Sequence, residues 1–133
     1  MDMKIYSGGG KQVLADHEKF TIRTDQPVED GGEGSAPEPF TLFLASLGTC
    51  AAHYVYSYCA RRDLPIDGIT LTQRVERDEK TKVIERVILE IRIPDGIPRK
   101  HWPAMVRSAE LCTVKKQLNS SIEFEITTRG GTA

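Results

Sequence analysis

The spacing of hydrophobic residues changes along the chain and divides it into elements. Three short segments, residues 3–6, 12–16 and 19–25, are separated by "SGGGK" and "HE". Their length and turn residues predict a small antiparallel meander. In residues 66–79 and 82–94 apolar and polar side chains alternate, which predicts a hairpin with one face in water. A last strand is expected in "SIEFEITT", with its apolar side chains on one side: Ile122, Phe124 and Ile126.

Two regions show helical spacing instead. From Pro39 to Ala60 apolar residues recur three and four positions apart and also occupy most other positions, and no charge appears before Arg61. This pattern predicts a buried central helix that Pro39 starts and Pro65 stops. A second helix is expected within residues 95–112, and "TVKKQL" is expected to continue as a helical turn or to form a second short helix. The order of elements predicts an α+β fold in a single domain, residues 1–133.

Between the meander and the first helix lies "QPVEDGGEGSAPEP", which is rich in glycine, proline and acidic residues. This composition excludes a helix or a central strand and predicts a loop. Loops of this length are uncommon in compact domains unless they serve a function. We therefore expect the loop to line a site.

Charge and composition exclude several classes of function. The chain has 18 Lys and Arg against 19 Asp and Glu, scattered along the sequence, which argues against a nucleic-acid partner. No apolar run of ~18 residues suggests a membrane span, and the first residues do not resemble a signal peptide. We expect a cytoplasmic protein without membrane contact. In that compartment three cysteines suggest packing, metal binding or redox chemistry rather than structural disulfides.

Cys50 lies midway along the predicted central helix, and Cys112 lies near the end of the second helical region. If the fold brings them together, one sulfur could be oxidised and the other could attack it to give a disulfide, without metal or cofactor. Cys50 would then have to be a thiolate, which burial disfavours unless a cation or hydrogen-bond donor offsets it. Arg23 and His53 are the candidate cations.

Other interpretations of the cysteines remain open. Cys50 and Cys112 could be two independent core residues, because buried cysteine often acts as a small hydrophobe. Cys59 follows Cys50 on the same helix and lies about 13 Å away along the axis, so the two cannot form a disulfide and packing is expected for Cys59. A metal site could combine Cys50 and His53 with Cys112 and His101, but "CAAH" alone is a weak signal. Neither a serine hydrolase elbow nor a phosphate-binding lysine accompanies these residues.

The segment "TDQPVEDGGEGSAPEPFTLFLASLGTC", followed by "AELCTVKKQL", resembles the OsmC/Ohr family of osmotically induced and organic-hydroperoxide-resistance proteins, in particular its less characterised OsmC-like branch. The resemblance implies an α+β fold with two central helices packed on antiparallel sheets. It also implies an intertwined homodimer with its active sites at the subunit interface. The implied activity is thiol-dependent reduction of organic hydroperoxides, which needs a dithiol reductant.

Carried over by position, Cys50 would be the peroxidatic cysteine, Cys112 the resolving cysteine and Arg23 the arginine that holds the thiolate. The family glutamate that directly follows the proline at the head of the helix is replaced here by Phe40. Glu33 or Glu38 in the loop could substitute for it. This departure supports a second hypothesis, in which the same pocket serves a small-molecule binding or redox-sensing module with little turnover.

Overall fold

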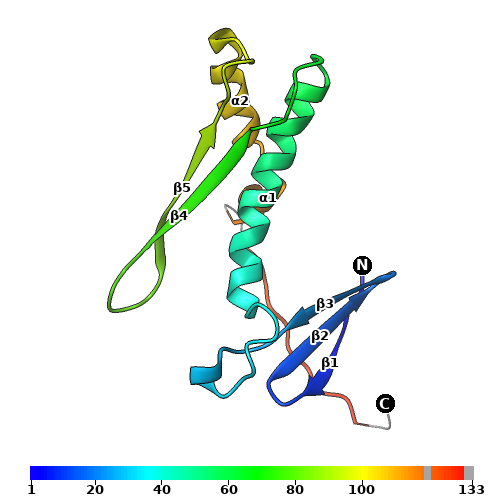
Figure 1. The fold of residues 1–133 in the computed structure, drawn as a ribbon. Helices are drawn as coiled ribbons and strands as arrows, with labels where there is room; N and C mark the ends of the chain where they lie inside the picture. Colours follow the sequence, from blue (N-terminus) through cyan, green and yellow to red (C-terminus); the bar gives the residue numbers. More distant parts are fainter. Residues whose placement is uncertain (119–120, 131–133) are drawn as a thin grey trace. The chain divides into compact units, whose positions relative to one another are not determined.

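A computed structural model describes residues 1–118 and 121–130 of the chain. The chain forms two compact units. The first contains Met1–Thr49 and Thr72–Glu90, and the second contains Cys50–Leu71 and the chain from Ile91 onward. Each unit is described by itself. The elements have the α+β composition that the sequence predicts, while the single domain over residues 1–133 stays a prediction (Figure 1).

The first unit opens with the predicted antiparallel meander. Its strands β1 (Lys4–Gly9), β2 (Gln12–His17) and β3 (Phe20–Thr24) form a sheet in the order β1-β2-β3. Ile5 pairs with Ala15, and Ala15 pairs with Ile22, so these three side chains share one face. Leu14 points to the opposite face and is the buried residue of β2.

The acidic loop after β3 is organised around Asp25, which is 1% exposed. The Asp25 carboxylate accepts hydrogen bonds from the backbone N–H groups of Gln26, Glu33 and Ser35 and from the Ser35 hydroxyl at 2.6 Å. A short 3-10 turn, η1 (Val28–Asp30), interrupts the loop and ends at Gly31, whose φ is 89°. The loop is therefore ordered by one buried acid, although its composition excludes a regular element.

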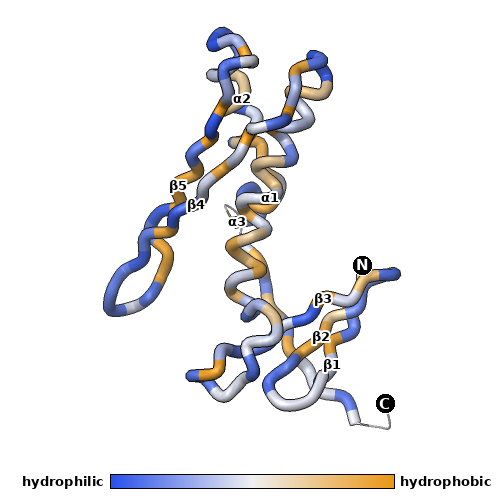
Figure 2. The backbone as a smooth tube through the Cα atoms, in the orientation of Figure 1, coloured by the Kyte–Doolittle hydropathy of each residue, from blue (hydrophilic) through white to orange (hydrophobic). Residues whose placement is uncertain are grey.

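Helix α1 (Pro39–Ala60) starts at the predicted proline, ends before the arginines that were expected in its last turn, and contributes residues to both units. Its sequence is apolar over most of its length (Figure 2). Within this chain, however, only one stripe of the helix is buried, and it consists of Leu47, Ala51, Val55, Tyr58 and Cys59. The expectation of a helix buried all round is thus wrong for the single chain, because the described residues cover one face of it.

The predicted hairpin consists of β4 (Thr70–Arg77) and β5 (Ile84–Arg92), which form a two-stranded sheet. In the second unit, side chains at the base of the hairpin pack beside the C-terminal half of α1 and the helical region η2 (Arg99–His101) and α2 (Trp102–Ala109). The buried cluster there contains Val55, Tyr58, Cys59, Ile69, Ile97 and Met105. This core fixes the half of α1 that carries Cys50.

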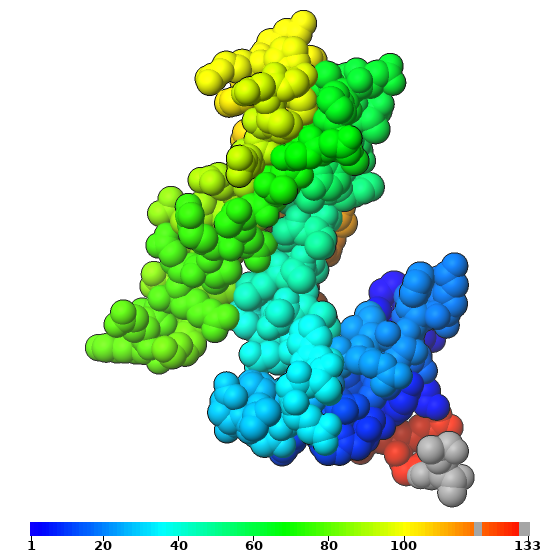
Figure 3. All heavy atoms as spheres, viewed as in Figure 1, coloured from blue at the N-terminus to red at the C-terminus, as the bar shows by residue number. Residues whose placement is uncertain are grey.

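The C-terminal part of the chain contains the second short helix that was one of the two predicted possibilities, but it lacks the predicted last strand. Helix α3 (Thr113–Leu118) is separate from α2, and Cys112 lies between them. Residues 121–130 form no strand, although the alternation of Ile122, Phe124 and Ile126 predicts one. A strand needs a neighbour for its backbone N–H and C=O groups, and neither sheet of the described chain pairs with this segment. All ten residues are exposed, in orange to red in Figure 3.

Candidate active site

The first residue of the candidate site is Cys50, in the middle of α1. Its side chain is half-buried, and its thiol is free. The next helical turn, from Ala51 to Val55, enters the core of the second unit, and both of these residues are at most 1% exposed. Packing on one side of α1 therefore holds Cys50 in place and leaves its sulfur open to contact from α3.

Cys112 directly precedes α3 and is 3% exposed. Its Sγ accepts a hydrogen bond from the Lys115 N–H at 3.4 Å, and its carbonyl oxygen accepts one from the Lys116 N–H at 3.1 Å. A side chain that bonds the amide three residues later is the arrangement of a helix N-cap. Cys112 thus starts α3, and its thiol, which forms no disulfide, is held in place by that role.

The structure brings Cys50 and Cys112 together. The backbone N–H of Val114 donates to the Cys50 sulfur and is the main cause that lowers the pKa of Cys50. Partial burial acts in the opposite direction, while hydrogen bonds from the Cys112 thiol and the Thr113 N–H lower the pKa of Cys50 further. Donors to the charged form stabilise a thiolate. The net effect is a Cys50 thiol that ionises more readily than an ordinary cysteine.

A second contact joins α1 to the same end of α3. The Tyr54 hydroxyl lies four residues after Cys50 and forms a hydrogen bond of 2.8 Å with the Thr113 hydroxyl. Residues four apart lie on the same face of a helix, so Tyr54 and Cys50 both face the start of α3. The site therefore consists of two thiols, two backbone amides and a pair of hydroxyls.

The structure places the two candidate cations, His53 and Arg23, in different surroundings. His53 is exposed and stacks edge-on against Tyr54, with ring centroids 5.4 Å apart. It is not among the groups that shift the pKa of Cys50, whose causes within the described chain are backbone amides, the Cys112 thiol and burial. Arg23 is exposed on β3 in the first unit, opposite Leu14 in the sheet register. The assignment of Arg23 beside Cys50 stays a prediction.

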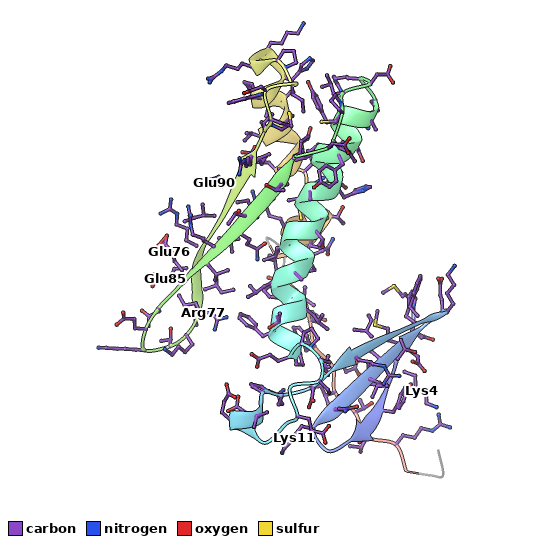
Figure 4. All side chains as sticks on the ribbon, in the orientation of Figure 1. Lys4, Lys11, Glu76, Arg77, Glu85 and Glu90 are labelled. Atoms are coloured by element: carbon purple, nitrogen blue, oxygen red, sulfur yellow. The ribbon has the colours of Figure 1, made fainter. Side chains whose placement is uncertain are left out.

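The ring of Phe40, at the position where the family resemblance implies a glutamate, is covered by an arginine of the same unit. The Arg77 guanidinium lies 4.3 Å from the centroid of the Phe40 ring, and Phe43 stacks on Phe40 at 5.9 Å. Figure 4 shows Arg77 extending from β4, and its neighbour Glu76 pairs with Arg86 at 3.2 Å. Glu33 and Glu38 are exposed in the loop. Position 40 thus holds an aromatic ring under the Arg77 cation, where the family resemblance implies a carboxylate.

Burial and contacts describe the surroundings of the remaining candidate residues, Cys59 and His101. Cys59 is fully buried in the core of the second unit, and burial raises the pKa of its thiol, in part offset by the Arg62 charge. This agrees with a packing role. His101 accepts or donates a hydrogen bond with the Tyr58 hydroxyl at 2.9 Å. Over residues 1–118 and 121–130, no group of three or more His, Cys, Asp or Glu side chains could hold a metal ion.

The groups that sequence reasoning missed are the backbone amides of Thr113 and Val114 and the hydroxyl of Tyr54. Main-chain donors leave no mark on residue type, so no motif could reveal them. One signal was present: Cys112 is followed by a threonine and a short helical segment, which is compatible with a cysteine at a helix start. That signal would have placed donors near Cys112 but not near Cys50.

Comparisons with known proteins give the class of the fold first. Three solved structures are similar to this chain over most of its length. A protein assigned to osmotic stress induction and detoxification response, from Psychrobacter arcticus, has a TM-score of 0.72 at 23% identity, with 86% of this chain and 85% of that chain covered. A Legionella pneumophila organic hydroperoxide resistance protein OsmC has a TM-score of 0.60 at 22% identity, with 89% and 88% covered. The Bacillus subtilis organic hydroperoxide resistance protein OhrB has a TM-score of 0.56 at 20% identity, with 90% and 91% covered.

At these identities the three structures establish the fold. The family follows from the sequence: the model of the OsmC-like protein family matches residues 32–127, which include α1, the hairpin, α2, α3 and both site cysteines. The chain belongs to the OsmC-like protein family. No protein with a curated functional description matches it significantly.

Proposed function

We propose that this protein reduces organic hydroperoxides through a thiol pair, with Cys50 as the peroxidatic and Cys112 as the resolving cysteine. The observation that carries the proposal is the contact between the two thiols, with backbone amides that lower the pKa of Cys50. An unreactive core pair would gain nothing from donors aimed at one sulfur. The Legionella and Bacillus structures, which are named for organic hydroperoxide resistance, support organic hydroperoxides as the substrate class.

The proposed reaction has three balanced steps. The Cys50 thiolate attacks the terminal oxygen of the hydroperoxide, the O–O bond breaks, and the leaving alkoxide takes a proton to become the alcohol. Cys50 is then a sulfenic acid. The Cys112 sulfur attacks the Cys50 sulfur, an S–S bond forms, and water leaves. A dithiol reductant returns both cysteines to thiols by exchange and is itself oxidised to a disulfide.

A steady-state assay with cumene hydroperoxide and dithiothreitol tests the activity. We expect turnover in the wild type and none above background in Cys50→Ser, with Cys59→Ser as the matched control that keeps wild-type turnover. After one equivalent of peroxide without reductant, non-reducing peptide mapping should find a disulfide between Cys50 and Cys112. Absence of turnover, or a disulfide that involves Cys59, would contradict the proposal.

A second candidate function rests on Phe40. Because an aromatic ring under Arg77 replaces the carboxylate of the better-known relatives, the same site could bind or sense a thiol-reactive small molecule with little turnover. The two functions differ in rate and not in the first chemical step. Single-turnover oxidation of Cys50 with negligible steady-state turnover would favour the sensor, and rapid turnover would favour the peroxidase.

The proposed functional state is a homodimer. Apolar side chains on one face of the first sheet are exposed in the single chain: Ile5, Val13, Phe20 and Ile22 are 40% to 61% exposed. The side chains of α1 outside its buried stripe are half-buried or exposed as well. Exposed apolar area of this kind is typical of protein interfaces.

A membrane-spanning helix is not found in the part of the chain that the structure describes.

A further inference from the structure

Tyr54 stands out among the three tyrosines in the C-terminal half of α1 because of its partner. The Tyr56 hydroxyl donates to the Ile69 carbonyl at 3.2 Å, and the Tyr58 hydroxyl bonds to His101 at 2.9 Å. Both bonds lie within the core region of the second unit. The Tyr54 hydroxyl instead bonds to the hydroxyl of Thr113, the first residue of α3, at 2.8 Å.

The start of α3 is built from contacts with the two cysteines. A helix leaves its first four N–H groups without partners inside the helix. In α3 the N–H groups of Thr113 and Val114 bond to the Cys50 sulfur. Those of Lys115 and Lys116 bond to the Cys112 sulfur and carbonyl oxygen. Three of these amide groups are therefore directed at the two sulfurs, and the fourth, from Lys116, forms the first backbone bond of the helix.

A six-residue helix cannot hold this arrangement by its own stability. Isolated helices shorter than ~12 residues are marginal in water, and most of their stability in proteins comes from tertiary contacts. Five of the six residues of α3 are exposed, and Val114 is half-buried. Packing alone thus gives α3 little anchorage, and the bond between Tyr54 and Thr113 ties its first residue to α1.

We propose that Tyr54 is a positioning residue for the thiol pair: its bond to Thr113 holds the first turn of α3 where its amides reach the Cys50 sulfur. Tyr54 does not touch the reacting atoms. It acts through Thr113 and Val114, so its loss should reduce thiolate formation at Cys50 without removing any group that bonds to the sulfur. The inference rests on the proposed role of Cys50 as a nucleophile.

The test measures the rate at which iodoacetamide alkylates Cys50 between pH 5 and 10, with the modified peptide quantified by mass spectrometry. In Tyr54→Phe we expect the apparent pKa of Cys50 to rise and the rate at pH 7 to fall roughly two- to tenfold, the effect of one net hydrogen bond. Tyr56→Phe removes the same atom from the same helix and should leave both values at the wild-type level. Equal behaviour of the two variants would overturn the proposal.

Variants of Thr113 test the same bond from its other end. Thr113→Val should reproduce the effect of Tyr54→Phe, Thr113→Ser should behave as the wild type, and the double variant should be no slower than either single one. Additive effects would contradict a shared bond. Because alkylation needs no peroxide, the outcome is independent of turnover: inactive protein with a shifted Tyr54→Phe profile would reject the proposed function alone.

Discussion

Asp25 carries an unusual number of hydrogen bonds for a single carboxylate. It is 1% exposed and accepts from three backbone N–H groups and one hydroxyl, all contributed by Gln26, Glu33 and Ser35. The two bonds from Ser35 lower the pKa of Asp25 the most, and the bonds from Gln26 and Glu33 lower it further. Burial acts in the opposite direction, and the net result is a pKa of about 2. The charged form of this acid is thus the one that fits the loop.

The loop should therefore lose stability in acid in a defined pH range. A carboxyl group whose pKa is lower in the folded than in the unfolded protein stabilises the fold fully above the unfolded value, ~3.9. The contribution disappears as the pH falls through about 2. We expect Asp25→Asn to be less stable than the wild type at pH 6 in urea denaturation, and the difference to shrink between pH 4 and pH 2.

The control for this prediction is Asp67→Asn, since Asp67 is exposed and lies outside the acidic loop. That variant should follow the wild type throughout the pH range. A constant difference between Asp25→Asn and the wild type down to pH 2 would show that the charge of Asp25 is not what stabilises the loop.

Cys59 and Cys50 should differ sharply in reactivity although both lie on α1. Cys59 has no exposed surface and burial raises its pKa, whereas Cys50 is half-buried with a lowered pKa. At pH 7 we expect alkylation of Cys50 to be at least tenfold faster in the native protein, because the thiolate is the nucleophile. In 8 M urea the two rates should converge. Comparable native rates would place Cys59 outside the core.

At the scale of elements, Gly48 in α1 permits a close approach of β4. A Cβ at Gly48 would lie 2.7 Å from Oε1 of Gln73, whose Nε2 donates to the Leu44 carbonyl at 3.0 Å. Gln73 Oε1 is buried and has no hydrogen-bond partner among the described residues. The side chain of Gln73 is therefore held against the backbone of α1 by a single bond.

Gly48→Ala should show two opposing effects. Alanine favours a helix interior over glycine by about 1 kcal/mol. The new Cβ, however, pushes Gln73 away and weakens its bond to Leu44, a loss of about 1 kcal/mol. We expect the free energy of unfolding of Gly48→Ala to change little in the wild-type background. In a Gln73→Ala background the same substitution should stabilise the protein by about 1 kcal/mol, as measured by urea denaturation.

An equal change in both backgrounds would show that Gly48 and Gln73 are not coupled. Gly96→Ala serves as a control for glycine replacement in general, because a Cβ at Gly96 meets no atom within 4 Å. The change in the free energy of unfolding that Gly96→Ala causes should be the same in the wild-type and Gln73→Ala backgrounds.

The elements that sequence reasoning predicts well are those whose signal is local. The meander, α1 and the hairpin follow from period and turn residues, and Pro39 marks the observed start of α1. The last strand was not found at residues 121–130, because alternation states which face is apolar but not which strand is the neighbour. For "TVKKQL" the second short helix is the predicted possibility that the structure shows. Its start at Cys112 was not predictable, because cysteine is not among the usual N-cap residues.

The site was predictable in part for the same reason. Cys50 and Cys112 are conspicuous in the sequence, and in the structure the Cys112 thiol is among the groups that lower the pKa of Cys50, while their catalytic roles stay a prediction. The sequence search for a cation near Cys50 considered only side chains, whereas the donors found there are amides of Thr113 and Val114. Likewise Asp25 is one acid among many in an acidic region, and its importance depends on which backbone groups surround it.

For the whole molecule, the first sheet presents an apolar face that the single chain leaves open. Ile5 and Ile22 flank Ala15 in the register, and Val13 and Phe20 lie two residues along their strands on the same face. The opposite face carries Leu14, which is buried, and polar residues such as Thr21 and Asp16, joined by a hydrogen bond of 2.8 Å. The two faces of one sheet thus allow a matched comparison.

A charge on the apolar face should prevent the proposed homodimer from forming. Burial of an unpaired lysine at an interface is strongly unfavourable, so we expect Ile22→Lys to elute as a monomer when the wild type is a dimer by size-exclusion chromatography with light scattering. Thr21→Lys adds the same charge to the neighbouring residue on the other face and, although it removes the bond to Asp16, should leave the protein dimeric. A monomeric wild type would exclude the dimer, and a dimeric Ile22→Lys would place the interface elsewhere.

If the site also depends on the second copy, Ile22→Lys should lose peroxide turnover together with the dimer. Alkylation of Cys50 depends on α3 of the same chain and should persist in this variant.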